Sequence, residues 1–361
     1  MAKIFYSMSG EGRGHAGRAA AIVDSLRHQH ELTLFAPHQA YDFLAPRYRR
    51  SDVAVHRIPG LRFHYSQRRL DLAKSIGTGL HFWANVSSAV HSLAEKIQQD
   101  QPELVVTDFE PLLPRAAERC GVPYVSFDHQ HFLTSYDLSA LPRSLRWWAS
   151  AMTLAVRAHY TRQQATIVTS FFHLPLNPGH EKTISVGPIV RSAIRQARPV
   201  RGDYLVSYLR PHTPDQVLRE LEYAPCEVRV YGLGERPDRG NLRFHPFDQQ
   251  QFVDDLAGCM AVVGAAGNQT LGEALQLGKP VLALPEDKHF EQRINAFYLQ
   301  RNGCGRSVLL SEFQRNDVFD FIDSLDQFIP HVNEMPRDGN ETATAAILDQ
   351  LQAPTPVSMV A

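Results

Sequence analysis

Short apolar runs alternate along the chain with longer segments of mixed polarity. Runs of this length and composition are typical of buried strands, whereas the longer segments carry apolar residues at helical spacing. The predicted strands are 3–8, 31–36, 102–108, 123–128, 165–170, 203–208, 227–231, 242–247, 261–263 and 281–284. The predicted helices include 16–26, 78–97, 143–157, 311–328 and 342–351. This alternation predicts an α/β protein with two parallel sheets.

The clearest such unit is 261–285, which contains a strand, a turn of small residues, a short helix and a second strand. Gly278, followed by Lys and Pro, predicts the end of the helix. The small residues 264–267 leave the backbone uncovered where the helix begins, and that positive end suits a phosphate. Glu273 lies about one and a half turns further on, where its carboxylate can accept from two vicinal hydroxyls. Thr270 and Glu273 also match a capping box, so a purely structural role for Glu273 stays open.

A second polar cluster follows the strand 281–284 and contains Glu291, Gln292 and Asn295 at the start of a helix. The two clusters follow successive strands, and open α/β sheets bind ligands at the carboxyl ends of their strands. We therefore expect both clusters to line one ligand site, although an exposed helix start is the alternative for Glu291 and Gln292.

Composition narrows the class of protein. A length of 361 residues predicts two domains, and a net charge of −1 gives no reason to expect a nucleic-acid partner. Residues 1–190 hold 20 basic against 15 acidic residues, and residues 191–361 hold 17 against 23. The four cysteines show no metal-binding or disulfide spacing. The chain starts directly in a strand, without a signal peptide, and no apolar run reaches membrane-spanning length, so we expect a cytoplasmic protein.

The loop after the first strand contains Gly12, Gly14 and Gly17, which form a literal G-x-G-x-x-G. A dinucleotide site also needs an acidic residue at the end of the second strand, and 36–38 contains none. We therefore expect no NAD or FAD, and no other cofactor. Arg13 and Arg18 flank His15, where they can bind an acidic group or remain solvated.

The segment 266–273 resembles the glycine turn of GT-B glycosyltransferases of the MurG and plant secondary-product types, which ends in a ribose-binding glutamate. The segment 291–296 resembles their Asp/Glu-Gln-x-x-Asn-Ala element, whose first two residues hold sugar hydroxyls. One departure is that the phosphate-binding histidine of the plant enzymes is replaced by Ala265 or Ala266. Contact with the diphosphate would then fall to the backbone amides of Gly267, Asn268 and Gln269.

The resemblance assigns roles in the first half as well. The loop residues Gly12, Arg13 and Gly14 would face the acceptor or a phosphate. His15 would be the general base, since its ordinary pKa lies near neutrality, and Asp108 would be its partner. A His15 that only caps the helix or contacts the acceptor is the alternative. An Asp108 that only caps the helix beginning near 111 is the alternative.

In the second half, Arg210 follows the strand 203–208 at its carboxyl end, where it can pair with the diphosphate, and a free surface arginine is the alternative. The resemblance places Phe247, or His245, against the base of the nucleotide. Glu273 would bind the ribose, and Glu291 with Gln292 would bind the transferred sugar.

The resemblance implies two Rossmann-like parallel-sheet domains that face each other across a cleft. We expect an acceptor-binding domain at 1–188 and a nucleotide-sugar-binding domain at 189–335. A helix at 336–351 would pack back toward the first domain, and 352–361 would be a flexible tail. Trp147 and Trp148 lie on the helix 143–157, which we expect to be a packed domain helix rather than one that dips into a membrane interface.

The resemblance implies an inverting, metal-independent transfer of a sugar from a nucleotide donor, expected to be UDP-linked, to an acceptor hydroxyl. Lipid, glycan and anionic acceptors stay open, as does peripheral contact with the inner face of a membrane. One alternative is a nucleotide-sugar epimerase that uses Glu110 and Asp128. Another is a non-catalytic protein that binds nucleotide sugars. We expect the polar cluster 128–131 to line the acceptor site.

Overall fold

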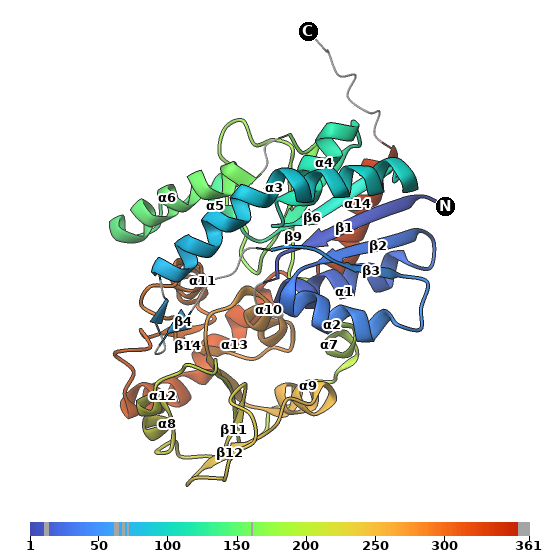
Figure 1. Cartoon of the computed structure of the whole chain (residues 1–361). Coiled ribbons are helices and arrows are strands. Elements are labelled where there is room, and N and C mark those ends of the chain that lie inside the picture. Colours follow the sequence, from blue (N-terminus) through green and yellow to red (C-terminus); the bar gives the residue numbers. More distant parts are fainter. Residues whose placement is uncertain (11–13, 61–64, 67–68, 71, 160–161, 353–361) are drawn as a thin grey trace. The chain divides into compact units, whose positions relative to one another are not determined.

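The computed structural model describes residues 1–352 apart from 11–13, 61–64, 67–68, 71 and 160–161 (Figure 1). The chain forms two compact units. The first contains 1–138, 149–189 and the C-terminal segment from 339, and the second contains 139–148 and 190–338. The division therefore falls inside one helix, α6 (Arg143–His159), rather than only at the segment that follows residue 188.

The first unit is built on a sheet of seven parallel strands in the order β3-β2-β1-β6-β7-β8-β9. These strands are β1 (Lys3–Met8), β2 (Glu31–Ala36), β3 (Ala54–Arg57), β6 (Leu104–Asp108), β7 (Tyr124–Asp128), β8 (Ala165–Thr169) and β9 (Thr183–Val186). A separate antiparallel pair is formed by β4 (Tyr65–Ser66) and β5 (Arg69–Leu70). The helices of the first unit, besides α6, are α1 (Gly14–Leu26), α2 (His38–Tyr48), α3 (Leu72–Asp100), α4 (Leu112–Cys120), α5 (Phe132–Ser135) and α14 (Asn340–Gln352).

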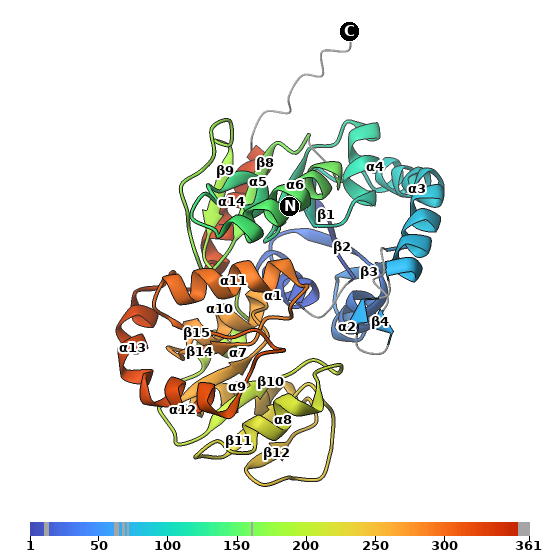
Figure 2. The same cartoon turned by 90° about the vertical axis from the view of Figure 1, so that its left-hand side faces the viewer.

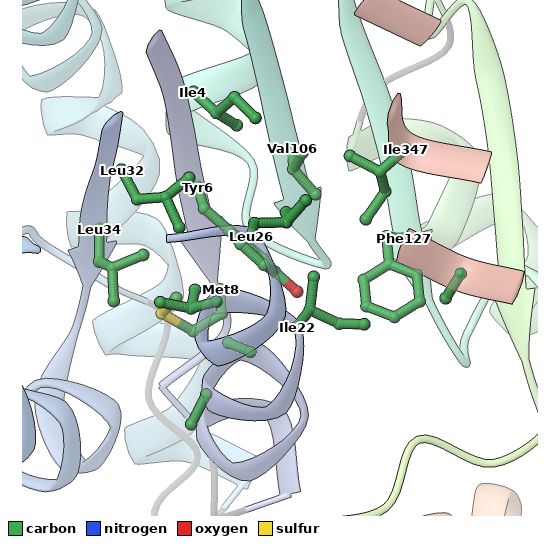
Figure 3. Packing of buried hydrophobic residues seen from close by; sticks show 14 of the residues in the cluster. Ile4, Tyr6, Met8, Ile22, Leu26, Leu32, Leu34, Val106, Phe127 and Ile347 are labelled. Atoms are coloured by element: carbon green, nitrogen blue, oxygen red, sulfur yellow. The ribbon is translucent and has the colours of Figure 1, made fainter. Parts of the chain in front are cut away.

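Successive side chains of a strand point to opposite sides of the sheet, and both sides carry a buried apolar cluster. Ile4, Tyr6 and Met8 of β1 pack on one face with residues of α1 and with Ile347 of α14 (Figure 3). Phe5 lies on the other face, in the cluster that α3 and α4 cover. The C-terminal helix α14 thus completes the core of the first unit, against β8 and β9 (Figure 2).

The second unit has six parallel strands in the order β12-β11-β10-β13-β14-β15. They are β10 (Leu205–Tyr208), β11 (Val228–Tyr231), β12 (Leu242–Phe244), β13 (Ala261–Gly264), β14 (Val281–Ala283) and β15 (Gly305–Ser307). The helices are α7 (Ser192–Gln196), α8 (Asp215–Leu221), α9 (Gln249–Gly258), α10 (Asn268–Gln276), α11 (Phe290–Arg301), α12 (Arg315–Asp323) and α13 (Leu325–Glu334).

Each sheet has one point where the strand order reverses. In the first unit this point lies between β1 and β6, and in the second it lies between β10 and β13. Open parallel sheets bind ligands outside the carboxyl ends of the strands at such points. The two glycine-containing turns of the sequence, after β1 and after β13, both lie there.

One predicted helix is wrong in extent. The segment 311–328 was expected to be a single helix, but α12 ends at Asp323 and α13 begins at Leu325. Ser324 lies between them with φ −96° and ψ 0°, and its hydroxyl donates to the carbonyl of Asp320 at 2.6 Å. Such a local hydrogen bond from serine competes with the regular helical pattern.

Candidate functional site

His15 and Asp108 lie together at the switch point of the first sheet. β1 and β6 are paired so that Met8 is opposite Asp108, and α1 begins at Gly14 after the loop that follows β1. His15 is the second residue of α1, and its Nδ1 lies 2.8 Å from Oδ1 of Asp108. The Asp108 side chain is fully buried, while 13% of the His15 side chain is exposed. The predicted pair is therefore in contact.

Arg18 is a third member of this cluster. It lies one turn after His15 on α1, and its Nε and Nη2 donate to the two carboxylate oxygens of Asp108 at 2.8 and 2.7 Å. Only 4% of its side chain is exposed, so neither a solvated arginine nor one that reaches out for an acidic acceptor is correct. Burial opposes its charge, but Asp108 more than offsets this and raises the pKa of Arg18. The i, i+3 spacing from His15 was the sequence signal for this contact.

The hydrogen-bond network assigns the tautomer of His15. Two groups contact Nδ1 of His15: Nη2 of Arg18, at 3.0 Å, and the carboxylate of Asp108. The guanidinium can only donate a hydrogen bond and the carboxylate can only accept one. A proton on Nδ1 is donated to Asp108 at 2.8 Å, whereas without it two lone pairs would face each other at that distance. The shorter contact, with Asp108, thus favours the proton on Nδ1, and in the neutral ring Nε2 then carries the lone pair that a general base needs.

The turn after β6 is fixed by Glu110 rather than by Asp108. The Glu110 carboxyl group accepts from the backbone amides of Leu112 and Leu113, at 2.7 and 2.9 Å, and so caps α4. The alternative that Asp108 serves as this cap is wrong, because Glu110 takes that role. Phe109, between the two acids, has a φ of 53°, which is rare for a large side chain. Unusual backbone of this kind is concentrated at functional sites.

The polar cluster 128–131 is occupied by contacts within the first unit. Oδ2 of Asp128 contacts Nδ1 of His131 at 2.7 Å and accepts from the hydroxyl of Ser126, also at 2.7 Å. Burial alone would raise the pKa of Asp128, but His131 reverses this and the pKa is lowered. His129 contacts the carbonyl of Thr169 at 2.9 Å. Asp128 and Glu110, the acids that an epimerase would need, are thus buried in structural hydrogen bonds.

Of the predicted loop residues, Gly12 and Arg13 lie outside the described residues, and Gly14 is the first residue of α1. Within the described part of the chain, no group of three or more His, Cys, Asp or Glu side chains is arranged to hold a metal ion.

In the second unit, α10 begins directly at the predicted turn. Gly267 is the residue before its first turn, and Asn268 and Gln269 open the helix. A Cβ added at Gly267 would meet no atom within 4 Å, so the space beside this backbone is open. A Cβ at Gly264 would instead come within 2.5 Å of the Tyr208 carbonyl oxygen, which explains the glycine at the end of β13. The helix end presents its positive pole beside that open space.

Glu273 is bound by an arginine that the sequence did not single out. Arg191 donates from Nε to Oε1 at 2.8 Å and from Nη2 to Oε2 at 2.6 Å. Gln269 adds a third hydrogen bond, from its Nε2 to Oε1 at 2.9 Å. The capping-box alternative is not what the structure has, because α10 starts at Asn268 and Thr270 lies inside it. Arg191 and Glu273 are 82 positions apart, a separation that no local pattern reveals.

The second polar cluster is joined to the glycine turn. Asn295 of α11 is fully buried, and its side-chain amide donates to the carbonyl of Ala266 at 3.1 Å. Gln292 is also buried, and its Oε1 accepts from the backbone amide of Glu286 at 2.9 Å. Glu291, in the first turn of α11, is partly exposed. The two elements that the sequence paired are therefore held together by a direct hydrogen bond.

Arg210 and Phe247 lie on the β10 and β12 side of the same sheet. Nη1 of Arg210 donates to Oε1 of Glu286 at 2.9 Å, and Nε2 of His212 lies 3.0 Å from the same oxygen. Phe247 follows β12, remains 38% exposed and meets the ring of Tyr208 edge to face at 6.5 Å. Glu286 was missed as the residue that holds Arg210 in place.

Among the helices that the structure describes, none has the length and apolar character needed to cross a bilayer.

Comparison with other proteins identifies the family. The profile described as glycosyl transferase family 1 matches residues 2–326. A glycosyltransferase of Methanosarcina mazei is 22% identical over 341 residues, with 85% of this chain and 86% of the relative covered. A glycosyltransferase of Methanosarcina acetivorans is 25% identical over 342 residues, with 85% and 83% covered.

Solved structures agree on the fold. The calicheamicin glycosyltransferase CalG4 superposes with a TM-score of 0.69 at 16% identity, covering 99% of both chains. A UDP-glucosyltransferase from Polygonum tinctorium gives 0.69 at 15% identity, with 98% of both chains covered. The glycosyltransferase VinC, solved with dTDP, gives 0.64 at 14% identity, with 97% of this chain and 99% of its own covered. The chain therefore belongs to glycosyl transferase family 1 and is a glycosyltransferase with the GT-B fold.

Proposed function

We propose that the enzyme transfers a sugar from a nucleotide sugar, with UDP as the nucleotide, to an acceptor hydroxyl with inversion at the anomeric carbon. The observation that carries this proposal is the 2.8 Å contact between His15 and Asp108, because a proton on Nδ1 would make Nε2 available as the base. In this scheme the first unit supplies the base and the second unit binds the nucleotide sugar.

The proposed reaction is a single displacement. Nε2 of His15 takes the proton of the acceptor hydroxyl, and the acceptor oxygen forms a bond to the anomeric carbon. The bond from that carbon to the diphosphate oxygen breaks at the same time, and the nucleoside diphosphate leaves with the electron pair. Attack from the side opposite the leaving group inverts the anomeric configuration. Asp108 stabilises the imidazolium that forms, as a carboxylate does in other His–Asp pairs.

The second unit offers a chemically matched group for each part of the nucleotide sugar. Glu273 suits the ribose hydroxyls, and Gln292 with Glu291 suits the hydroxyls of the sugar. The open backbone at Gly267 and the positive end of α10 suit the diphosphate and offset the charge that grows on it, so we propose that no metal ion or cofactor takes part. The choice of UDP has support from a relative of this fold that is a UDP-glucosyltransferase, while VinC was solved with dTDP.

For the acceptor we propose a lipid or a lipid-linked glycan at an anionic membrane surface. The sequence favoured a packed helix at 143–157, but on α6 Trp147 is 65% and Leu154 is 69% exposed, and this exposure is the support for the proposal. The segment between Asp137 and Glu181 contains four arginines and no acidic residue. Exposed tryptophan with arginine favours a membrane interface. Sedimentation with anionic and with neutral vesicles tests this: Trp147→Ser should weaken pelleting with the anionic vesicles, and equal pelleting would contradict the proposal.

The activity itself is tested with defined sugar nucleotides. UDP-glucose, UDP-N-acetylglucosamine and dTDP-glucose are offered with phenolic, sugar and lipid acceptors, and release of the nucleoside diphosphate is compared with the glycoside formed. We expect a β-linked product from an α-linked UDP-sugar, measured by the anomeric proton coupling. Retention of the α configuration, or an epimerised nucleotide sugar as the product, would overturn the proposal.

A further inference from the structure

The carboxylate of Glu273 has almost no acceptor capacity left. Oε1 accepts from Nε of Arg191 and from Nε2 of Gln269, and Oε2 accepts from Nη2 of Arg191. A carboxylate offers about four lone-pair positions, so about one remains. Two vicinal ribose hydroxyls need two. The ribose role proposed for Glu273 therefore requires one of the present partners to leave.

Arg191 is the partner that a nucleotide can compensate. Glu273 is 3% and Arg191 is 17% exposed, so separation would leave two poorly solvated charges. Losing one partner of such a pair is strongly unfavourable unless another group replaces it. Two ribose hydroxyls can replace the arginine at Glu273, and the diphosphate can replace the carboxylate at Arg191. Both replacements arrive in the same molecule.

The position of Arg191 is suitable for this exchange. It directly precedes α7, which packs against α10, and its guanidinium shares Oε1 of Glu273 with the side chain of Gln269. Gln269 belongs to the first turn of α10, where the diphosphate is proposed to bind. The guanidinium thus shares an acceptor with a side chain from the first turn of α10, and a planar fork of donors is well matched to phosphate oxygens.

We propose that Arg191 changes partner when the nucleotide sugar binds, leaving Glu273 to the ribose and pairing with the diphosphate. The inference rests on the proposed function, since it uses the same nucleotide site. The exchange makes Arg191 select against nucleosides. A nucleoside must displace the guanidinium from Glu273 but has no phosphate to pair with it. The exchange also separates ribose from deoxyribose, because a single hydroxyl fits the one acceptor position that is already available.

The test measures binding of uridine, 2′-deoxyuridine and UDP by calorimetry to the wild type and to Arg191→Met. The control is Arg201→Met, which removes an exposed arginine of the same unit that pairs with Asp326. We expect Arg191→Met to bind uridine about fivefold more tightly, since its hydroxyls meet a carboxylate without its strongest partner, and UDP about tenfold more weakly. Affinity for 2′-deoxyuridine should change by less than about twofold, and Arg201→Met should match the wild type for all three ligands.

The opposite signs for uridine and UDP distinguish an exchange from simple positioning. If Arg191 only orients Glu273, the variant should lose affinity for both ligands, and that result would overturn the inference. Unchanged affinity for both would overturn it as well. Failure of the wild type to bind any nucleoside diphosphate, dTDP included, would instead remove the proposed function. If Arg191→Met does not fold, Arg191→Lys answers the same question, because it keeps the charge but loses the fork: the signs for uridine and UDP must still be opposite.

Discussion

Arg18 and Asp108 form a bidentate ion pair at the end of β6, with hydrogen bonds of 2.8 and 2.7 Å. The same carboxylate meets His15, so the arginine fixes the plane of the acid to which the histidine is bound. Arg18 also brings a positive charge to within 3.0 Å of Nδ1 of His15. The predicted pair of His15 and Asp108 is in fact a group of three, and its buried part is the ion pair.

Arg18→Met should destabilise the first unit severely. The substitution leaves the fully buried Asp108 without its main counter-charge, and breaking a buried pair in this way costs about 3–5 kcal/mol. Chemical denaturation of the variant and the wild type measures this loss. Arg57→Met is the matched control, because Arg57 is 53% exposed and its pair with Asp42 lies at the surface. We expect about 1 kcal/mol or less for the control, and similar losses in both variants would contradict the buried ion pair.

Asp108→Asn should impair transfer without abolishing binding of the nucleotide sugar. The amide oxygen of the new asparagine can accept from Arg18. In that orientation the NH2 group of the asparagine points toward Nδ1 of His15. Nδ1 must then accept, the proton moves to Nε2, and the base is lost. A general base contributes about 10²–10⁴-fold in rate, so we expect a loss of kcat in that range.

Two measurements separate this effect from general damage. The ring ¹⁵N shifts of His15 should report protonated Nδ1 in the wild type and protonated Nε2 in Asp108→Asn. The affinity for UDP should change by less than about twofold, since Asp108 belongs to the other unit. A variant with full transfer activity would remove His15 and Asp108 from the mechanism.

The sequence was informative about strands and about residues at their carboxyl ends, because both leave local patterns. The apolar runs located β1, β6, β13 and β14, and the glycines after β1 and β13 marked the two switch points. The partners of the site residues were less accessible. Arg191 meets Glu273 across 82 positions, and Glu286 meets Arg210 across 76. Such pairs depend on strand order, which the sequence pattern does not contain.

The role of Arg18 was not predicted for a different reason. Its spacing from His15 places both on one side of α1, so contact between them was readable. What the sequence could not supply was the burial of that side, because the switch from β1 to β6 decides which acid lies above it. Long-range pairing thus turned an arginine that composition alone would leave in solvent into part of the core.

Asn295→Leu should weaken nucleotide binding as well as stability. The side chain is fully buried and joins α11 to the carbonyl of Ala266 in the glycine turn. Its loss leaves that carbonyl without this donor, at a cost of about 1–3 kcal/mol. Because the turn precedes the first amides of α10, we also expect the affinity for UDP to fall, measured by calorimetry. Asn333→Leu, at an exposed position of α13, is the control and should retain both properties.

Glu110 should make the stability of the enzyme fall as the pH rises from about 5 to 7. Burial raises the pKa of this carboxyl from 4.5 to about 7 in the folded protein. Between these values the unfolded chain has released the proton and the folded chain still holds it, so raising the pH favours unfolding. The loss is on the order of 3 kcal/mol and is complete above pH 7, while below pH 4.5 it is absent. Denaturation at pH 5 and pH 8 should show this drop in the wild type, and Glu110→Gln should show a smaller one because its side chain does not titrate. An equal drop in both proteins would assign the pH dependence to other groups. His159 is not one of them, because burial lowers its pKa and its titration makes stability rise with pH.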